Sequence, residues 1–300
     1  MKQLYNFRKT IVAFSVMLVG MNLTQEAVAQ QNPFAASYFQ NQYLANPAMA
    51  GGDNKVKAAV GYRKQWSGIS NSPYSLYATG EYSSSDKLNF GVNVYNDKAG
   101  MLNTSSAMLT YAYYLPVTKN GGRVHLGISA GAVNRRIDMK DFNGDPGDVL
   151  LTDGNKIRFD GGIGIAFTNK QITVQAAFPN MVTYFNKEND SIVNRPTFFA
   201  AASYKLSFND GDLILEPKVA YRGMKGFDNI IDAGANVTLK QVNLFGIYHT
   251  SKNITAGAGL MIAEKLWISA AYTSAGSAIK EYTDGNFEVG LSFALGGKEK

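Results

Sequence analysis

The stretch Ile157-Arg-Phe-Asp-Gly-Gly-Ile-Gly-Ile-Ala-Phe167 decides the fold class. Its side chains alternate strictly between two faces, as β-strands do when their faces meet different surroundings. One face carries Ile157, Phe159, Gly161, Ile163, Ile165 and Phe167, and the other carries Arg158, Asp160, Gly162, Gly164 and Ala166. The first face suits lipid or an apolar core. The second needs water or charged partners, because burying an unpaired charge is costly.

The same alternation recurs from about residue 54 to the C-terminus. It predicts strands near 54–62, 74–82, 87–95, 104–116, 123–133, 156–167, 171–178, 197–207, 213–222, 229–239, 242–249, 254–262, 265–273 and 286–294. Each has roughly the 9–11 residues that a tilted strand needs to cross a bilayer. Closing the sheet removes the edges that lipid would leave unpaired. We therefore expect an all-β fold, a transmembrane antiparallel up-and-down β-barrel of about fourteen strands.

The connections between these strands alternate in length. Short ones, such as 83–86 and 168–170, are expected to alternate with long ones, such as 63–73, 96–103 and 134–155. This alternation is typical of barrels with short periplasmic turns and long external loops, whereas a soluble sandwich has no reason to sort its loops. An even strand count puts both ends of the barrel domain on the periplasmic side.

The N-terminus reads as a cleavable signal peptide over residues 1–29. Lys2, Arg8 and Lys9 precede a short apolar run, and Ala27-Val-Ala29 supplies the small residues needed for cleavage before Gln30. A membrane anchor is the alternative. We expect export to the bacterial outer membrane, with a periplasmic N-terminal segment over 30–53 and the barrel over 54–300. Whether residues 30–53 fill the lumen or bind a periplasmic partner stays open.

Composition excludes several classes of function. The chain has no cysteine, which excludes disulfides and thiolate metal sites. A net charge of +6 without a concentrated Lys/Arg stripe argues against nucleic-acid binding. With 30 Gly, 17 Tyr and 17 Phe, the chain is typical of a glycine- and aromatic-rich β-protein.

Two motifs suggest chemistry, and in both cases a plainer interpretation is favoured. Gly127-Ile-Ser-Ala-Gly131 matches the G-x-S-x-G pattern of hydrolases but lies within a strand. His125 shares its face with Ser129 at about 13 Å by strand rise. The loop Asp141–Asp148 resembles a calcium loop but has Pro146 and Thr152 where Gly and Glu are needed. We expect no enzymatic activity, no cofactor, no metal and no small-molecule substrate.

A family resemblance covers nearly the whole mature chain. It rests on Ser37-Tyr-Phe-Gln-Asn-Gln-Tyr43, Asn46-Pro-Ala-Met-Ala-Gly51 and Tyr62-Arg-Lys-Gln-Trp-Ser-Gly68, with weaker matches at Asn96–Gly100, Tyr111–Tyr114, Pro179-Asn180 and Arg195–Thr197. In these motifs the chain resembles the PorP/SprF family of Bacteroidetes outer-membrane proteins. The chain departs from barrels that end in an aromatic residue, because Phe293 is internal and Lys300 is last.

The resemblance implies a barrel of the type IX secretion and gliding machinery in outer-membrane lipid. Its partners would be a periplasmic ring and a peptidoglycan-binding protein, or a large secreted adhesin. We expect partner binding by Asn46, Pro47, Gly51, Tyr62, Arg63, Gln65 and Trp66, with ordinary packing as the alternative for the last four. The alternative function is a passive porin or small-solute transporter. Five charged residues are predicted to face the lumen, where they either line a pore or form salt bridges that close it: Arg158, Asp160, Glu216, Lys218 and Arg222.

Overall fold

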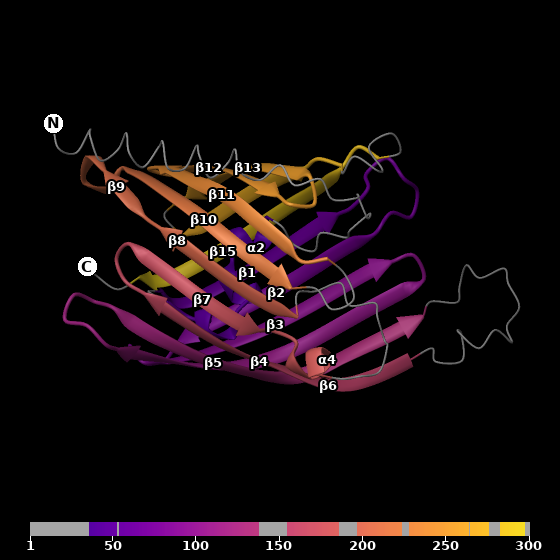
Figure 1. Ribbon diagram of the computed structural model, residues 1–300, viewed down its shortest axis with the longest axis horizontal. Helices are drawn as coiled ribbons and strands as arrows, with labels where there is room; N and C mark the ends of the chain where they lie inside the picture. Colours follow the sequence, from indigo (N-terminus) through magenta and orange to yellow (C-terminus); the bar gives the residue numbers. More distant parts are fainter. Residues whose placement is uncertain are drawn as a thin grey trace, which may run out of the picture.

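Antiparallel strands follow one another around a closed sheet in the computed structural model (Figure 1). The structure describes residues 36–52, 54–137, 155–185, 197–223, 228–263, 265–275 and 283–297. The predicted signal peptide 1–29, its cleavage site and the acidic loop 141–148 lie outside the described residues. The strands are β1 (Asn54–Lys64), β2 (Tyr74–Ser83), β3 (Leu88–Ala99), β4 (Leu102–Pro116), β5 (Arg123–Ile137), β6 (Asn155–Thr168), β7 (Ile172–Phe178), β8 (Phe198–Tyr204), β9 (Leu206–Phe208), β10 (Leu213–Gly223), β11 (Ile230–Leu239), β12 (Val242–His249), β13 (Asn253–Ile262), β14 (Leu266–Thr273) and β15 (Asn286–Gly297).

Pairing of the last strand with the first closes the barrel. The ladder between β15 and β1 runs from Asn54 opposite Gly297 to Lys64 opposite Phe287. Strands β8 and β9 are two parts of one span, separated at Lys205, and both pair with β10. The sheet therefore has fourteen spans in an antiparallel up-and-down order. The predicted fold class and all fourteen predicted strands are confirmed, with ends shifted by a few residues.

The predicted long connection 96–103 is wrong. Strand β3 continues to Ala99 and β4 begins at Leu102, so only Gly100 and Met101 join them. Gly100 has a φ of 59°, the left-handed conformation that a tight turn uses and that glycine adopts without strain. The hydrophobic alternation fades at Asn96 and Asp97, although the hydrogen-bonded ladder goes on. The expected alternation of loop lengths therefore holds only in part.

The two faces of the sheet differ as the alternation predicts. In β12, Val242, Leu244 and Tyr248 are exposed, while Asn243 and His249 are buried. Leu109, at the middle of β4, is 71% exposed on the outer face. Such an apolar outer band is the surface that bilayer lipid covers. The buried face of each strand points into the lumen, where Asp160, Glu216, Lys218 and Arg222 lie, as predicted.

The barrel has two distinct ends. We name one the turn end, because it carries connections 84–87, 117–122, 169–171, 209–212, 240–241 and 263–265, with Asn54 and Gly297 beside them. We name the other the loop end, because it carries the remaining connections, among them 65–73 and 274–285. The short helix α4 (Met181–Phe185) follows β7 at the loop end (Figure 1). No helix in the described ranges is long and apolar enough to cross a membrane.

Candidate functional site

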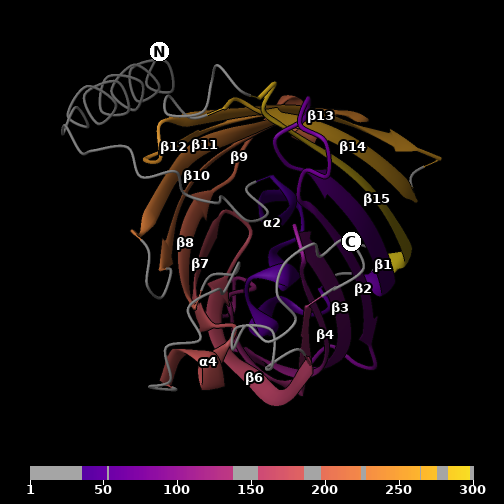
Figure 2. The same ribbon diagram turned by 90° about the vertical axis from the view of Figure 1, so that its right-hand side faces the viewer.

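Residues 36–52 lie inside the barrel, and we name them the plug (Figure 2). They form helix α2 (Ser37–Gln40) and the 3-10 helices η1 (Gln42–Leu44) and η2 (Pro47–Met49). The plug begins beside Glu288 near the loop end and ends beside Glu81 near the turn end, so it runs along the lumen. The sequence left open whether residues 30–53 fill the lumen or bind a periplasmic partner, and their described part, 36–52, lies in the lumen. Aromatic rings that water would surround in the periplasm are covered by the barrel wall instead.

An ion cluster at the loop end of the lumen holds the start of the plug. The carboxylate of Asp232 accepts hydrogen bonds from Nε and Nη2 of Arg222 at 2.7 and 2.8 Å, and pairs with Nδ1 of His249 at 2.5 Å. The Tyr38 hydroxyl of the plug donates to the same carboxylate. The Nε2 atom of His249 continues the network to the Thr255 hydroxyl at 2.7 Å. All of these side chains are buried, which strengthens each charge-assisted bond.

A second carboxylate, Glu288 of β15, holds the neighbouring residues of the plug. It accepts hydrogen bonds from the Ser37 backbone N–H and hydroxyl, both at 2.9 Å, and from the Ala36 N–H at 3.4 Å. The Nε atom of Arg63 in β1 lies 3.5 Å from it. Arg63 and Glu288 are both almost fully buried, so their charges compensate one another inside the lumen.

The middle of the plug is bound by small polar side chains of the wall. Asn41 donates to Thr79, and the Tyr43 hydroxyl donates to Thr110 at 2.8 Å. Burial raises the pKa of the Tyr43 phenol, so it stays protonated and can donate this bond. The Lys218 ammonium donates to the carbonyl oxygen of Phe39 at 3.1 Å and lies 4.3 Å from the centre of its ring.

Helix η2 packs against β5 and β6 where both strands carry glycine. A Cβ atom on Gly127 would lie 2.2 Å from the Ala48 nitrogen, and one on Gly164 would lie 1.9 Å from Oδ1 of Asn46. Asn46 caps η2 by accepting from the Ala48 N–H at 2.9 Å. Its amide also donates to Gln175 at 3.1 Å. The glycines therefore let the plug backbone approach the wall closely.

The plug reaches the turn end through backbone contacts. The Tyr114 hydroxyl donates to the Ala50 carbonyl oxygen at 2.8 Å, and the Gly51 N–H donates to Glu81 at 2.8 Å. Glu81 is also paired with Lys57 at 3.3 Å. Gly51 and Gly52 have φ values of 91° and 128°, a conformation that favours glycine. The chain turns here from the plug into β1.

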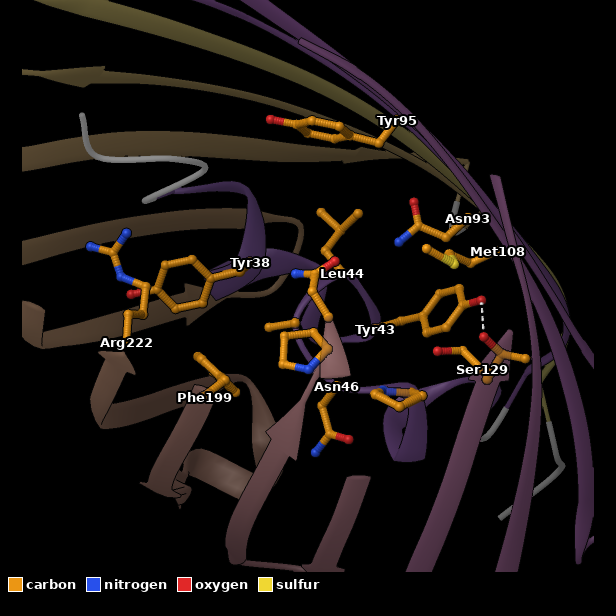
Figure 3. A pocket seen from close by; sticks show the side chains of 15 residues that line it. Tyr38, Tyr43, Leu44, Asn46, Asn93, Tyr95, Met108, Ser129, Phe199 and Arg222 are labelled. Atoms are coloured by element: carbon orange, nitrogen blue, oxygen red, sulfur yellow. Dashed lines mark hydrogen bonds between the residues drawn. The ribbon is translucent and has the colours of Figure 1, made fainter. Parts of the chain in front are cut away.

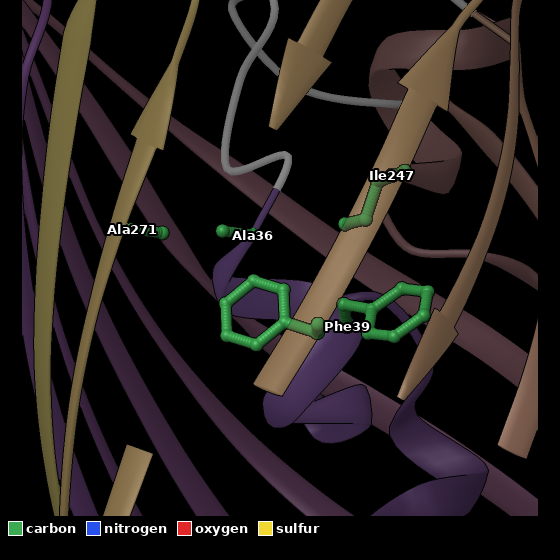
Figure 4. Close-up of a cluster of buried hydrophobic side chains, with 5 residues drawn as sticks. Ala36, Phe39, Ile247 and Ala271 are labelled. Carbon is green, nitrogen blue, oxygen red and sulfur yellow. The ribbon is translucent and has the colours of Figure 1, made fainter. Parts of the chain in front are cut away.

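Apolar contacts between plug and wall are small and separate. Phe39 stacks on Phe245 with ring centres 6.2 Å apart, and Ala36, Ile247 and Ala271 complete this cluster (Figure 4). Elsewhere Tyr38 meets Phe199 edge to face at 5.6 Å. The contacts give the plug several aromatic anchor points but no continuous hydrophobic core.

A cavity of about 60 Å³ remains between plug and wall (Figure 3). Tyr38, Tyr43 and Asn46 line it from the plug, and the wall side includes Asn93 and Phe199. This volume exceeds the roughly 10–15 Å³ that a cavity needs to hold one water molecule, so water fits between plug and wall at this place.

Comparison with known proteins identifies the family. The model of the family described as type IX secretion system membrane protein PorP/SprF matches residues 27–293. The chain belongs to the PorP/SprF family. The resemblance seen in the sequence motifs is thereby confirmed. The comparison with curated protein sequences found no match.

Solved structures similar to this PorP/SprF protein are outer-membrane β-barrels. The CymD monoaromatic hydrocarbon channel has 10% identity and a TM-score of 0.52, over 85% of this chain and 92% of that one. A TodX mutant, also a monoaromatic hydrocarbon channel, has 10% identity and a TM-score of 0.49, over 84% and 93%. Omp33 of Acinetobacter baumannii has 8% identity and a TM-score of 0.49, over 81% and 98%. At this identity the likeness to CymD concerns the fold alone.

The residues predicted to bind partners fall into two groups in this PorP/SprF barrel. Asn46, Pro47 and Gly51 belong to the plug, and Asn46 and Pro47 are buried. Arg63 and Gln65 are also buried, at the loop end of β1. These side chains contact this chain itself.

Tyr62 and Trp66 lie nearer the surface. Tyr62 is 40% exposed on the outer face, where its ring lies 6.0 Å from that of Tyr74. Trp66 is half-buried in the loop that follows β1. Partner binding by all seven residues stays a prediction.

Sequence reasoning missed the residues that bind the plug. Tyr38, Asp232, His249 and Glu288 come from segments far apart in the sequence, and only the barrel register brings them together. A usable signal was the concentration of aromatic residues at Tyr38, Phe39 and Tyr43 ahead of the first strand.

The serine of the G-x-S-x-G motif, Ser129, lies on the inner face of β5 and lines the cavity beside the plug. The Ser129 hydroxyl lies 3.5 Å from the Gly162 carbonyl oxygen. His125 hydrogen-bonds Thr168 at 2.8 Å and stacks on Tyr114 with ring centres 3.7 Å apart. Gly127 of the motif therefore packs against the plug, and Ser129 and the neighbouring His125 bond to different partners.

Proposed function

We propose that this PorP/SprF barrel docks type IX secretion machinery or a large secreted adhesin at the outer membrane. Family membership makes the chain a type IX secretion component. The proposal of docking, as opposed to passive transport, rests on the occupied lumen. A passive porin needs a standing aqueous passage, whereas here residues 36–52 are fitted to the wall from loop end to turn end.

The rim of the loop end supplies the docking surface in this proposal. Tyr62 presents an exposed ring there, and Trp66 lies three residues after Arg63, which forms the buried ion pair of β1. The Trp66 backbone N–H donates to the side-chain oxygen of Asn286 at 3.0 Å, and the Ser67 backbone N–H donates to the Gly285 carbonyl oxygen at 2.9 Å. These bonds hold the loop to the neighbouring strand, so the indole is preorganised for a partner.

Gene deletion and complementation test the proposal. Deletion is expected to abolish surface display of at least one large secreted protein, and complementation with the wild-type gene is expected to restore that display. Display is measured by proteomics of peptides that protease releases from intact cells. Trp66→Ala is expected to reduce display at least fivefold. Trp267→Ala, which changes a half-buried indole on β14, is the matched control and should leave display intact. Normal display in the deletion strain would refute the proposed function.

A passive porin remains the alternative that the same strains address. It predicts that the purified full-length protein conducts steadily in planar bilayers, and that the deletion strain takes up small solutes more slowly. Display of surface proteins would then be unchanged.

A further inference from the structure

The lumen wall binds main-chain atoms of the plug as well as its side chains. Glu288 accepts from the N–H groups of Ala36 and Ser37, and Glu81 accepts from that of Gly51. From the other side, Lys218 donates to the carbonyl oxygen of Phe39, and Tyr114 donates to that of Ala50. Every polypeptide offers these backbone groups, so such contacts do not require the plug sequence.

The remaining polar contacts use amide, hydroxyl and phenol side chains of the plug. Thr79, Thr110 and Asn243 each bond one such side chain, Gln175 bonds those of Gln42 and Asn46, and Asp232 accepts from the Tyr38 hydroxyl. The aromatic positions are Phe245 and Phe199, which receive Phe39 and Tyr38. Another segment with amide or hydroxyl side chains and two suitably spaced aromatic residues would satisfy the same wall.

The charges of the wall are balanced without the plug. Asp232 keeps Arg222 and His249 as partners, and Glu288 keeps Arg63. Likewise Glu81 keeps Lys57, and Glu216 keeps Lys218. Removal of the plug therefore leaves no lone charge on these four carboxylates, and their surroundings are polar groups that water can hydrate.

The plug has little regular structure of its own, and glycines join it to the barrel. Its helices have four, three and three residues, too short to be stable alone. Two glycines with positive φ, Gly51 and Gly52, join it to β1 at the turn end. Rotation about this pair moves the plug without disturbing the barrel ladder, which starts at Asn54.

We propose that the lumen wall beneath the plug is a polypeptide-binding surface. A segment of a docked partner protein, carrying aromatic residues among amide and hydroxyl side chains, binds there in place of residues 36–52. This inference rests on the proposed docking function and adds where the partner is held. The plug is then a built-in occupant that keeps the surface covered between docking events.

A reversible covalent lock between plug and wall tests this inference. Because the chain has no cysteine, Asn41→Cys with Thr79→Cys places one pair of thiols where the native side chains lie 3.0 Å apart. The pair is closed as a disulfide, or with a short reducible bis-methanethiosulfonate where the sulfur atoms do not meet. The same full-length protein, reduced, is its own control, and the two single variants control for the substitutions.

Two readouts follow the lock. In cells, closing it is expected to lower surface display at least tenfold, and reduction to restore display. In detergent, a fluorescent peptide of residues 36–52 is expected to bind the reduced protein, and the bridged protein at least tenfold less. A scrambled peptide is the control.

Equal display and equal peptide binding by the bridged and reduced proteins would overturn the inference. If the reduced pair loses display, Tyr43→Cys with Thr110→Cys repeats the test at a second native contact. The two proposals fail separately. Normal display in the deletion strain refutes the docking function, whereas peptide binding to purified protein decides the wall surface independently of any display.

Discussion

Replacing Asp232 with asparagine is expected to destabilise the barrel by about 3–5 kcal/mol. The side chain of Asp232 is 1% exposed, and that of Arg222 is fully buried. The carboxylate receives two hydrogen bonds from Arg222 and further bonds from His249 and Tyr38. An amide of the same shape removes the negative charge, so the buried guanidinium loses the charge of its ion-pair partner. It also adds N–H groups that face other donors.

A double-mutant cycle separates the free energy lost with the ion pair from the free energy lost through changed packing. Removing both partners, as in Asp232→Asn with Arg222→Met, is expected to bring the loss back to about 1 kcal/mol, because no lone charge then remains. Stability is measured by urea unfolding of protein folded into lipid vesicles. The two tryptophans, Trp66 and Trp267, provide the fluorescence signal, and the gel mobility of folded and unfolded barrel provides a second one.

Two results would refute the reasoning about this cluster. One is a loss below about 1 kcal/mol for Asp232→Asn with Arg222 in place, which would mean that water or another group already neutralises the guanidinium. The other is a double variant as unstable as the single one, which would assign the loss to the Tyr38 and His249 contacts instead of the ion pair.

Three further predictions concern the plug and the lipid face. Gly127→Val is expected to push the plug from the wall and expose it to added protease, because a Cβ atom there would lie 2.2 Å from the plug backbone. Gly246→Val is the control, since a Cβ atom at Gly246 would have nothing within 4 Å. Equal digestion of the two variants would contradict the predicted displacement of the plug. Tyr43→Phe is expected to cost about 1–2 kcal/mol in the same urea assay, because it removes one buried hydrogen bond, and an unchanged midpoint would argue against that bond. Leu109→Arg, in the middle of a strand and 71% exposed, is expected to cost about 2–4 kcal/mol in vesicles if that face meets lipid, whereas a soluble fold would tolerate it.

The strands could be predicted because each one alternates between lipid and lumen. In β6, Ile157 and Phe159 are exposed on the outside while Asp160 is buried on the inside, so period two appears directly in the sequence. The prediction weakens where this contrast ends. At Asn96 and Asp97 both faces are polar, so the continued strand and the tight turn at Gly100 were interpreted as one loop.

The site was harder to predict than the barrel. That Arg222 and Asp232 face the lumen follows from alternation along β10 and β11, and their pairing follows because the strands are neighbours. The contact of Tyr38 with Asp232 joins residues 194 positions apart and depends on how the plug is seated. Nothing local in the sequence encodes that placement, because any polar inner wall offers partners to amides and phenols.

The occupied lumen is the central claim, and single-channel recording in planar bilayers tests it most directly. Fourteen strands spaced about 4.8 Å apart and tilted about 40° enclose a backbone radius of about 14 Å, wide enough for a water-filled passage once the plug is gone. The full-length protein is predicted to stay closed. A variant lacking residues 36–50 is predicted to open a steady conductance, because its lumen is then wide enough for water and ions. Equal conductance in the two proteins would contradict the account.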